Sequence, residues 1–220
     1  MKQPDSAQLK LLEPLLLEAI QHALELSESV SPVRQDALAP LRQELGLRLE
    51  ESNQEVRLLY VCTHNSRRSH LGQVWGQVAA WLYGFSSVKT YSAGTEVTEM
   101  NPRTVASLRR SGYRIEGAPG QNPHYRVQPL QEKVTTDVFP MECFSKLYDD
   151  VTIPQAELIA VMTCDHADKN CPVLPGARRI SLPWSDPKVA DDTDQEEAVY
   201  DQRSLQIASE MLWLFGHLQQ

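Results

Sequence analysis

The sequence has little of what secreted, membrane-spanning or nucleic-acid-binding proteins need. Its 220 residues include only four cysteines, too few for a disulfide scaffold, so we expect reduced thiols in a soluble, cytoplasmic protein. No stretch approaches the roughly 18 to 20 apolar residues of a membrane-spanning helix, and no signal peptide is visible. A net charge of −8 argues against broad binding of nucleic acid or lipid, yet permits one local anion site.

The chain is expected to have two parts, an N-terminal helical extension over residues 1–54 and an α/β domain over residues 55–220. Leucines and isoleucine recur in the first part at steps of three and four, from Leu9 to Leu24 and again from Leu38 to Leu49, which predicts a helical hairpin joined near Pro32. Such a hairpin must bury its apolar face. The two candidates for its partner are the body of the domain and a second copy of the chain, which would give a homodimer.

Four runs of strand length alternate with helical patterns in the second part. The runs lie at 56–61, 88–92, 158–163 and 178–182, and the helical patterns at 68–83, 102–112 and 196–218. This alternation predicts a four-stranded parallel sheet with helices on both faces, whereas residues 117–140 are expected to form a long loop. In such a sheet the ligand binds beyond the carboxyl ends of the strands.

The most informative segment follows the first predicted strand and opens the next helix. It reads Cys62-Thr63-His64-Asn65-Ser66-Arg67-Arg68-Ser69. A loop between a strand and a helix can turn its backbone N–H groups towards an oxyanion, and Arg68 can donate two hydrogen bonds to it. The same field favours the thiolate form of Cys62. The segment therefore predicts a nucleophilic cysteine in an oxyanion-binding loop, against the plainer alternative of a buried cysteine at a strand end.

Two further cysteines, Cys164 and Cys171, flank a polar segment after the third predicted strand. Three interpretations remain open at this point. They are inert thiols, ligands of a metal ion together with His166 and Asp168, or a redox pair that works with Cys62 by thiol–disulfide exchange. The spacing matches no common zinc motif, so we expect no bound metal.

The segment from Cys62 to Gly76 resembles the phosphate loop of the low-molecular-weight protein tyrosine phosphatase superfamily, and most of all its thioredoxin-coupled arsenate reductases. The resemblance runs from Val56 to the C-terminus. It continues in four further blocks, at 91–96, 101–103, 161–175 and 185–187. The N-terminal extension lies outside it, and the region 117–150 is longer than in these relatives.

The resemblance implies a phosphatase-like fold and two alternative activities. In the first, Cys62 attacks arsenate, Cys164 attacks the Cys62 sulfur and releases arsenite, and Cys171 passes the disulfide to a thioredoxin-like reductant. In the second, Cys62 and Asp186 hydrolyse phosphomonoesters such as phosphotyrosine. In both, Arg68 clamps the oxyanion and Asp186 is the acid. The oxyanion-binding loop is made of Thr63, His64, Asn65, Ser66, Arg67 and Ser69.

The sequence also departs from these relatives. They bind a potassium ion at positions matching Asn65 and Ser92, but Gln73 replaces their glutamate ligand, which argues against the ion, and we expect no other cofactor. Lys188 stands where phosphatases carry an aromatic residue after the Asp-Pro pair, which weakens the phosphotyrosine alternative. Cys143 is expected to be a buried apolar residue. A third alternative is a catalytically inactive protein whose N-terminal hairpin binds a partner.

Overall fold

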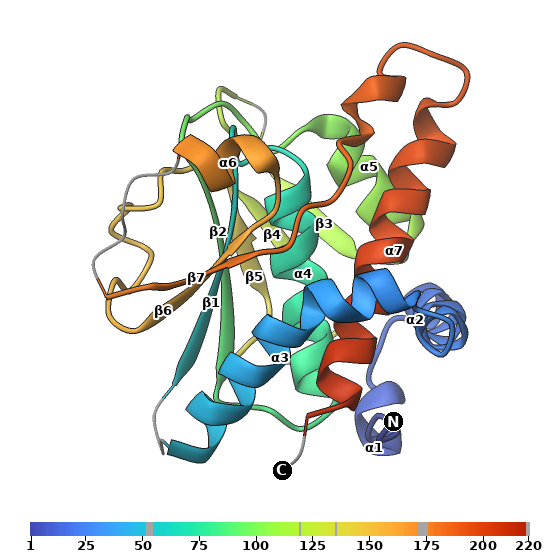
Figure 1. The fold of residues 1–220 in the computed structure, drawn as a ribbon. Coiled ribbons are helices and arrows are strands. Elements are labelled where there is room, and N and C mark those ends of the chain that lie inside the picture. The colour runs from blue at the N-terminus through green and yellow to red at the C-terminus, as the bar shows by residue number, and fades with distance from the viewer. Residues whose placement is uncertain (52–54, 119, 135, 171–175, 219–220) are drawn as a thin grey trace.

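A parallel sheet of four strands forms the centre of the molecule (Figure 1). The computed structural model describes residues 1–51, 55–118, 120–134, 136–170 and 176–218. The sheet order is β2-β1-β6-β7, and every neighbouring pair is parallel. Its strands are β1 (Val56–Cys62), β2 (Val88–Gly94), β6 (Leu158–Met162) and β7 (Arg178–Ser181). The predicted four-stranded parallel sheet is therefore confirmed.

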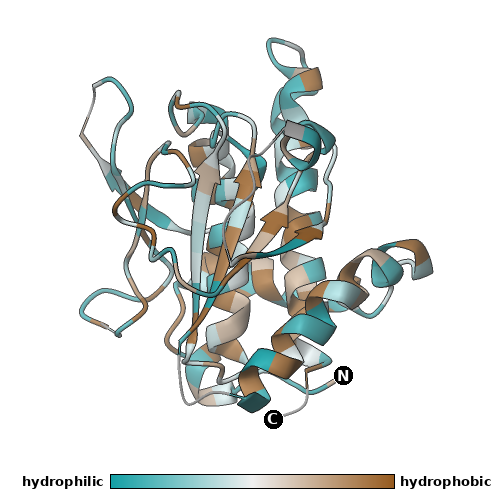
Figure 2. Ribbon diagram, turned by 60° about the vertical axis from the view of Figure 1, so that its left-hand side comes forward, coloured by the Kyte–Doolittle hydropathy of each residue, from teal (hydrophilic) through white to brown (hydrophobic). Residues whose placement is uncertain are grey.

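Both faces of the sheet are apolar, as expected for strands that are covered on each side. Along β1, Leu58 and Tyr60 belong to one buried cluster, and Leu59 and Val61 belong to another on the opposite face. Helix α4 (Arg68–Leu82) packs on β1 and β2 at the first face and carries α7 (Glu196–Gly216) on its other side, and the short helix α6 (Asp165–Asn170) packs on the second face. Figure 2 shows the hydrophobic residues concentrated in the strands and on the inward sides of the helices.

The N-terminal segment folds into helices α1 (Ser6–Leu9), α2 (Pro14–Ser27) and α3 (Pro32–Glu51). Pro14 and Pro32 occupy first helical positions, where a missing N–H costs no hydrogen bond. Most of the leucine face is buried in the same cluster as the sheet, with Leu9, Leu24 and Leu49 partly buried at its edge, and α2 and α3 pack against α7 (Figure 1). The body of the domain, one of the two expected partners, therefore covers this face. A homodimer stays a prediction.

The expectation of a loop over residues 117–140 is wrong in part. The middle strand of a second, antiparallel sheet, whose order is β3-β4-β5, lies inside this region, and the other two strands flank it. Its strands are β3 (Arg114–Gly117), β4 (Tyr125–Gln128) and β5 (Met141–Cys143). They hold only three or four residues each and carry few apolar side chains, so the Pro- and Gly-rich sequence around them hides the alternating pattern.

The remaining elements are helix α5 (Pro102–Arg110), capped by the Asn101 side chain, and a 3₁₀ helix, η1 (Pro187–Ala190), capped by Asp186. No helix within the described ranges is both long and apolar enough to cross a membrane. Because β1, β6 and β7 are parallel, the segments that follow them all begin at the same edge of the sheet. That edge carries Cys62, Cys164 and Asp186.

Candidate active site

The loop between β1 and α4 holds the nucleophile expected from the sequence. Cys62 is the last residue of β1 and is 4% exposed, and Arg68 is the first residue of α4. The intervening loop turns at Asn65, whose φ of 44° lies in the left-handed region that asparagine tolerates better than most residues. The loop thus connects the centre of the sheet to a helix N-terminus, as an oxyanion-binding loop requires.

A short hydrogen-bond relay reaches the Cys62 sulfur. Asn65 Nδ2 donates to Ser69 Oγ over 2.8 Å, and Ser69 Oγ lies 3.1 Å from Cys62 Sγ. Because the amide already donates to this hydroxyl, the hydroxyl hydrogen is free to point at the sulfur. A donor in that position stabilises a thiolate, which is the nucleophilic form of cysteine.

His70 connects the loop to β2, a role that the sequence analysis did not predict. It is fully buried; its Nε2 bonds Asn65 O over 2.9 Å, and its Nδ1 bonds Ser92 Oγ over 3.1 Å. Burial, and then the nearby Lys146 charge, lower the pKa of His70 to about 3. The ring is therefore neutral, with Nε2–H donating to the carbonyl and Nδ1 accepting from the serine. No spacing in the sequence signals this role.

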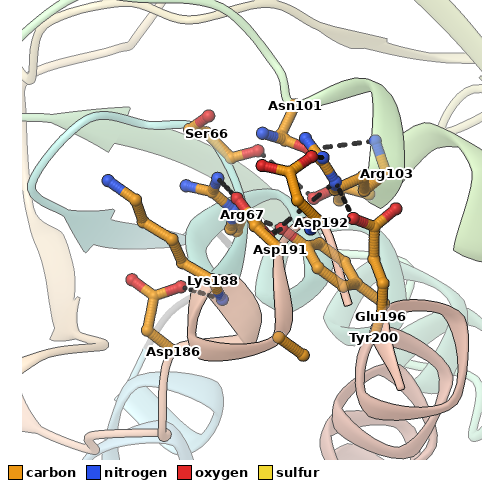
Figure 3. A network of polar contacts seen from close by, with 12 residues as sticks. Ser66, Arg67, Asn101, Arg103, Asp186, Lys188, Asp191, Asp192, Glu196 and Tyr200 are labelled. Carbon is orange, nitrogen blue, oxygen red and sulfur yellow. Dashed lines mark hydrogen bonds and ion pairs between the residues drawn. The ribbon is translucent and has the colours of Figure 1, made fainter. Parts of the chain in front are cut away.

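Arg68 and Asp186 form a direct ion pair beside the loop. Arg68 Nη2 lies 2.6 Å from Asp186 Oδ2, and Arg68 Nη1 donates to Trp184 O over 3.1 Å. Asp186 Oδ1 accepts from Lys188 N over 3.1 Å (Figure 3). The structure thus brings the expected anion clamp and the expected acid together, and an anion entering the loop competes with Asp186 for the Arg68 guanidinium.

The Arg67 side chain binds a network next to the loop (Figure 3). Its Nε donates to Tyr200 Oη over 2.6 Å, its Nη2 lies 2.8 Å from Asp191 Oδ2, and Tyr200 Oη donates to Asp191 Oδ1 over 2.7 Å. Arg103 joins from α5 through ion pairs with Asp192 and Glu196, each 2.6 Å long. The network connects the segment after Asp186 to the loop, and the Arg67 guanidinium bonds Tyr200 and Asp191 in it.

The other predicted loop residues surround the same site. His64 is exposed and lies 3.3 Å from Glu96, whereas the buried Ser66 offers its carbonyl to Asn101 N over 2.9 Å. Thr63 Oγ1 lies 3.6 Å from Cys164 Sγ, which brings the second predicted thiol against the loop.

The metal alternative for the second cysteine pair gains no support. His166 Nδ1 lies 3.2 Å from Thr63 Oγ1, and Asp168 pairs with Arg179 at 3.2 Å. No group of three or more His, Cys, Asp or Glu residues within the described ranges is arranged to hold a metal ion. Cys171 lies outside the described residues.

Cys143 is fully buried in β5, away from the loop, and burial raises its pKa to about 12. A thiol that stays protonated is a poor nucleophile.

The residues at the expected potassium site do not fit the ion. Asn65 Oδ1 accepts from Lys146 N over 2.9 Å, and Ser92 Oγ is bonded to His70. Gln73 offers only a neutral amide, whose Nε2 donates to Glu142 O over 3.3 Å. The Lys146 side chain, only 4% exposed, already brings a positive charge close enough to depress the pKa of His70. A potassium ion would have to displace protein donors and approach this ammonium.

Comparison with known proteins agrees with the resemblance found in the sequence. The family model of low molecular weight phosphotyrosine protein phosphatase matches residues 57–129. A protein named arsenate reductase from Halalkalibacterium halodurans is 27% identical over 141 residues, which are 64% of this chain and 80% of that protein. The arsenate reductase of Bacillus subtilis is 26% identical over 147 residues, which are 66% and 84%.

The fold agrees as well. The solution structure of a low molecular weight protein tyrosine phosphatase from Bacillus subtilis covers 72% of this chain and 94% of its own, with a TM-score of 0.50 and 14% identity. Over residues 57–129 the chain is similar to the low-molecular-weight phosphotyrosine phosphatase family, and proteins named arsenate reductase are among its relatives. Both kinds of relative are enzymes, and the match to the family model begins after the N-terminal helices.

Proposed function

We propose that this protein reduces arsenate to arsenite with Cys62 as the nucleophile and Cys164 and Cys171 as the thiols that complete the relay. The observation that carries the proposal is the position of Cys164. Val61 pairs with Met162 in the parallel ladder, and Thr163 N donates to Val61 O over 2.8 Å. Thr163 is therefore opposite Cys62, and Cys164 follows one residue later.

Strand geometry converts this register into a distance. Neighbouring strands lie about 4.8 Å apart and rise about 3.3 Å per residue, so strand geometry continued from Met162, where β6 ends, would put the Cα atoms of Cys62 and Cys164 roughly 6 Å apart. A disulfide needs about 4.4 to 6.8 Å. Both cysteines also belong to the same buried cluster. This estimate supports a Cys62–Cys164 disulfide in the proposed relay, formed by side-chain rotation with a small loop shift.

The reaction follows from these positions. The Cys62 thiolate attacks arsenic, and one arsenate oxygen leaves as water with the proton that Asp186 supplies. Arg68 and the loop N–H groups hold the remaining oxygens. The Cys164 thiolate then attacks the Cys62 sulfur. The sulfur–arsenic bond breaks and its electron pair stays on arsenic, which becomes arsenite, while the two thiols are oxidised to a disulfide.

Cys171 completes the cycle. Its thiolate attacks the Cys164 sulfur, frees the Cys62 thiolate and leaves a Cys164–Cys171 disulfide. A thioredoxin-like dithiol protein then reduces this disulfide and is itself oxidised to a disulfide. The relatives named arsenate reductase support this proposal through their overall similarity to the chain.

Phosphomonoester hydrolysis is the second candidate, and the Arg68–Asp186 pair beside Cys62 favours it. These three residues suffice for a phosphocysteine intermediate, with Asp186 first protonating the leaving oxygen and then activating water. In that case Cys164 has no part in turnover.

One comparison of variants separates the two. Wild type, Cys164→Ser and the control Cys143→Ser are assayed for thioredoxin-coupled, arsenate-dependent NADPH oxidation and for hydrolysis of an aryl phosphate. For a reductase, Cys164→Ser abolishes NADPH oxidation and Cys143→Ser keeps it, since that thiol is buried away from the loop. No arsenate-dependent oxidation in wild type, with aryl-phosphate turnover retained in Cys164→Ser, would assign the phosphatase activity instead.

A further inference from the structure

We propose that Arg34, in the N-terminal helix α3, is a positioning residue that holds the segment bearing Asp186 in place for catalysis. The inference rests on the acid role proposed above for Asp186, which both candidate reactions share. It gives the N-terminal extension, which lies outside the family resemblance, a part in the active site without contact with substrate.

Arg34 joins three parts of the chain at once. Its Nε and Nη2 donate to Glu210 Oε1 and Oε2 over 2.9 Å and 2.7 Å, and its Nη1 donates to Pro183 O over 3.0 Å. The planar guanidinium is suited to this arrangement, because it can direct a fork of two donors at one carboxylate and a third donor elsewhere. A lysine cannot make all three contacts.

Glu210 passes this contact to the segment before Asp186. The side chain is 2% exposed, deep in α7. Its Oε2 also accepts from Trp184 Nε1 over 2.8 Å, and its Oε1 accepts from Gln206 Nε2 over 2.7 Å. A buried carboxylate is stable only when it is paired and fully hydrogen-bonded. Arg34 supplies its bidentate ion pair, while Arg203 also faces the cluster and interacts with Glu210 and Asp186.

Trp184 connects the cluster to the catalytic pair. It is 3% exposed, its backbone N–H donates to Thr163 O over 3.1 Å, and its ring stacks on that of Tyr60 with centroids 6.4 Å apart. Its carbonyl accepts from Arg68, whose other nitrogen binds Asp186. Pro183 and Trp184 are therefore held on one side by Arg34 and Glu210, and they hold Arg68 and Asp186 on the other.

Loss of the Arg34 guanidinium removes both the Pro183 contact and the bidentate partner of Glu210, while the Arg203 charge stays nearby. The indole of Trp184 then hydrogen-bonds a buried carboxylate that has lost two of its donors, and the segment 182–190 gains freedom. An acid that is held loosely protonates the leaving oxygen less often, so kcat decreases. KM changes little, because the loop residues that bind the oxyanion are not altered.

The test compares Arg34→Gln, Arg34→Lys and a matched control, Arg110→Gln. Arg110 also makes a bidentate pair with α7, to Asp201 at 2.7 Å and 2.8 Å, but it does not contact the segment 182–190. Hydrogen exchange of amides 182–190 is measured first, because it reports the coupling whether or not the protein turns over arsenate. Arg34→Gln is expected to speed this exchange about tenfold. Arg34→Lys should fall between it and wild type, and Arg110→Gln should match wild type.

Turnover of the substrate that wild type accepts is measured next, alone and combined with Asp186→Asn. Arg34→Gln is expected to lower kcat about tenfold with little change in KM, and to have less than about a twofold effect in the Asp186→Asn background. If Arg34→Gln does not fold, Arg34→Lys serves for the same comparison.

Unchanged exchange over 182–190 in a folded Arg34 variant would overturn the inference, and so would an equal kcat loss in the presence and absence of Asp186. If wild type turns over neither arsenate nor aryl phosphate, the proposed function fails, and the exchange result still decides whether Arg34 holds the segment.

Discussion

Replacing Gly72 with alanine tests how closely α4, which begins with Arg68, must approach β1, which ends with Cys62. A Cβ at position 72 would lie 2.5 Å from Tyr60 Cδ1 and 2.8 Å from Cγ. Overpacking of this kind costs about 1–3 kcal/mol, and alanine returns about 1 kcal/mol of helix propensity. We therefore expect a net loss of about 1 kcal/mol in the free energy of unfolding, up to about 2 kcal/mol.

Gly76 provides a matched comparison on the same helix. A Cβ there would lie 2.6 Å from Tyr60 Oη, but 3.2 Å from the nearest ring carbons. The closest atom is thus the hydroxyl for Gly76 and the ring for Gly72. Replacing Tyr60 with phenylalanine removes the first clash and leaves the second. The lost hydrogen bond from Tyr60 Oη to Met211 Sδ, 3.1 Å long, is common to both double variants and cancels in the cycle.

The assay is urea unfolding followed by far-UV circular dichroism, for two double-mutant cycles with Tyr60→Phe. We expect a coupling energy of about 1 kcal/mol for Gly76→Ala and additivity within about 0.5 kcal/mol for Gly72→Ala. In addition, kcat should fall in Gly72→Ala, since the helix can relieve the clash only by moving Arg68 relative to Cys62. Equal rescue of both variants by Tyr60→Phe, or a Gly72→Ala protein as stable as wild type, would refute this account of the packing.

Three further outcomes are expected. His70, with its pKa lowered to about 3, stays neutral in the folded protein, whereas histidine in the unfolded chain is protonated below about pH 6.5. The contribution of the neutral ring to the free energy of unfolding is therefore fully present above that pH. It declines by up to about 1.4 kcal/mol per unit as the pH falls towards 3; urea titrations of His70→Gln should lack this component, and an unchanged slope would contradict it. Potassium and sodium chloride at equal ionic strength should give the same melting temperature and activity, whereas a potassium-specific rise would show that the ion binds. Asp186→Asn should lower kcat about 10²- to 10⁴-fold without weakening phosphate binding in calorimetry, because Arg68 loses its 2.6 Å partner; weaker binding would count against this competition.

The sequence predicts those parts of the fold that depend on residues close to one another along the chain. Strand β6 is a continuous apolar run, β1 is one apart from Arg57, and the loop from Cys62 to Arg68 lies between a strand and a helix that are adjacent in the chain. Period and spacing are therefore sufficient to find them. The three short strands of the second sheet were missed because each offers at most two inward positions, too few for a pattern to emerge.

Contacts between distant segments were beyond the sequence for a different reason. Tyr200 bonds Arg67 across 133 positions, and Lys146 N bonds Asn65 across 81. Neither partner belongs to a motif, and a tyrosine or a lysine occurs in many places without such a role. The loop itself was predictable, but the residues that hold it were not.

Arg34 and Glu210 show what a sequence does reveal about such a pair. An acidic residue between Ala208 and Met211, in the apolar part of α7, must have a partner if it is buried. The sequence therefore indicates that Glu210 needs a partner, but not which residue it is. The partner is 176 positions away, on a helix whose leucine pattern predicts burial but does not say against what. Because of the same contact, we expect deletion of the residues before position 55 to affect the rest of the domain. Removing them would leave Glu210 without its bidentate partner next to Trp184, and the effect would reach Asp186 through the segment that both residues hold.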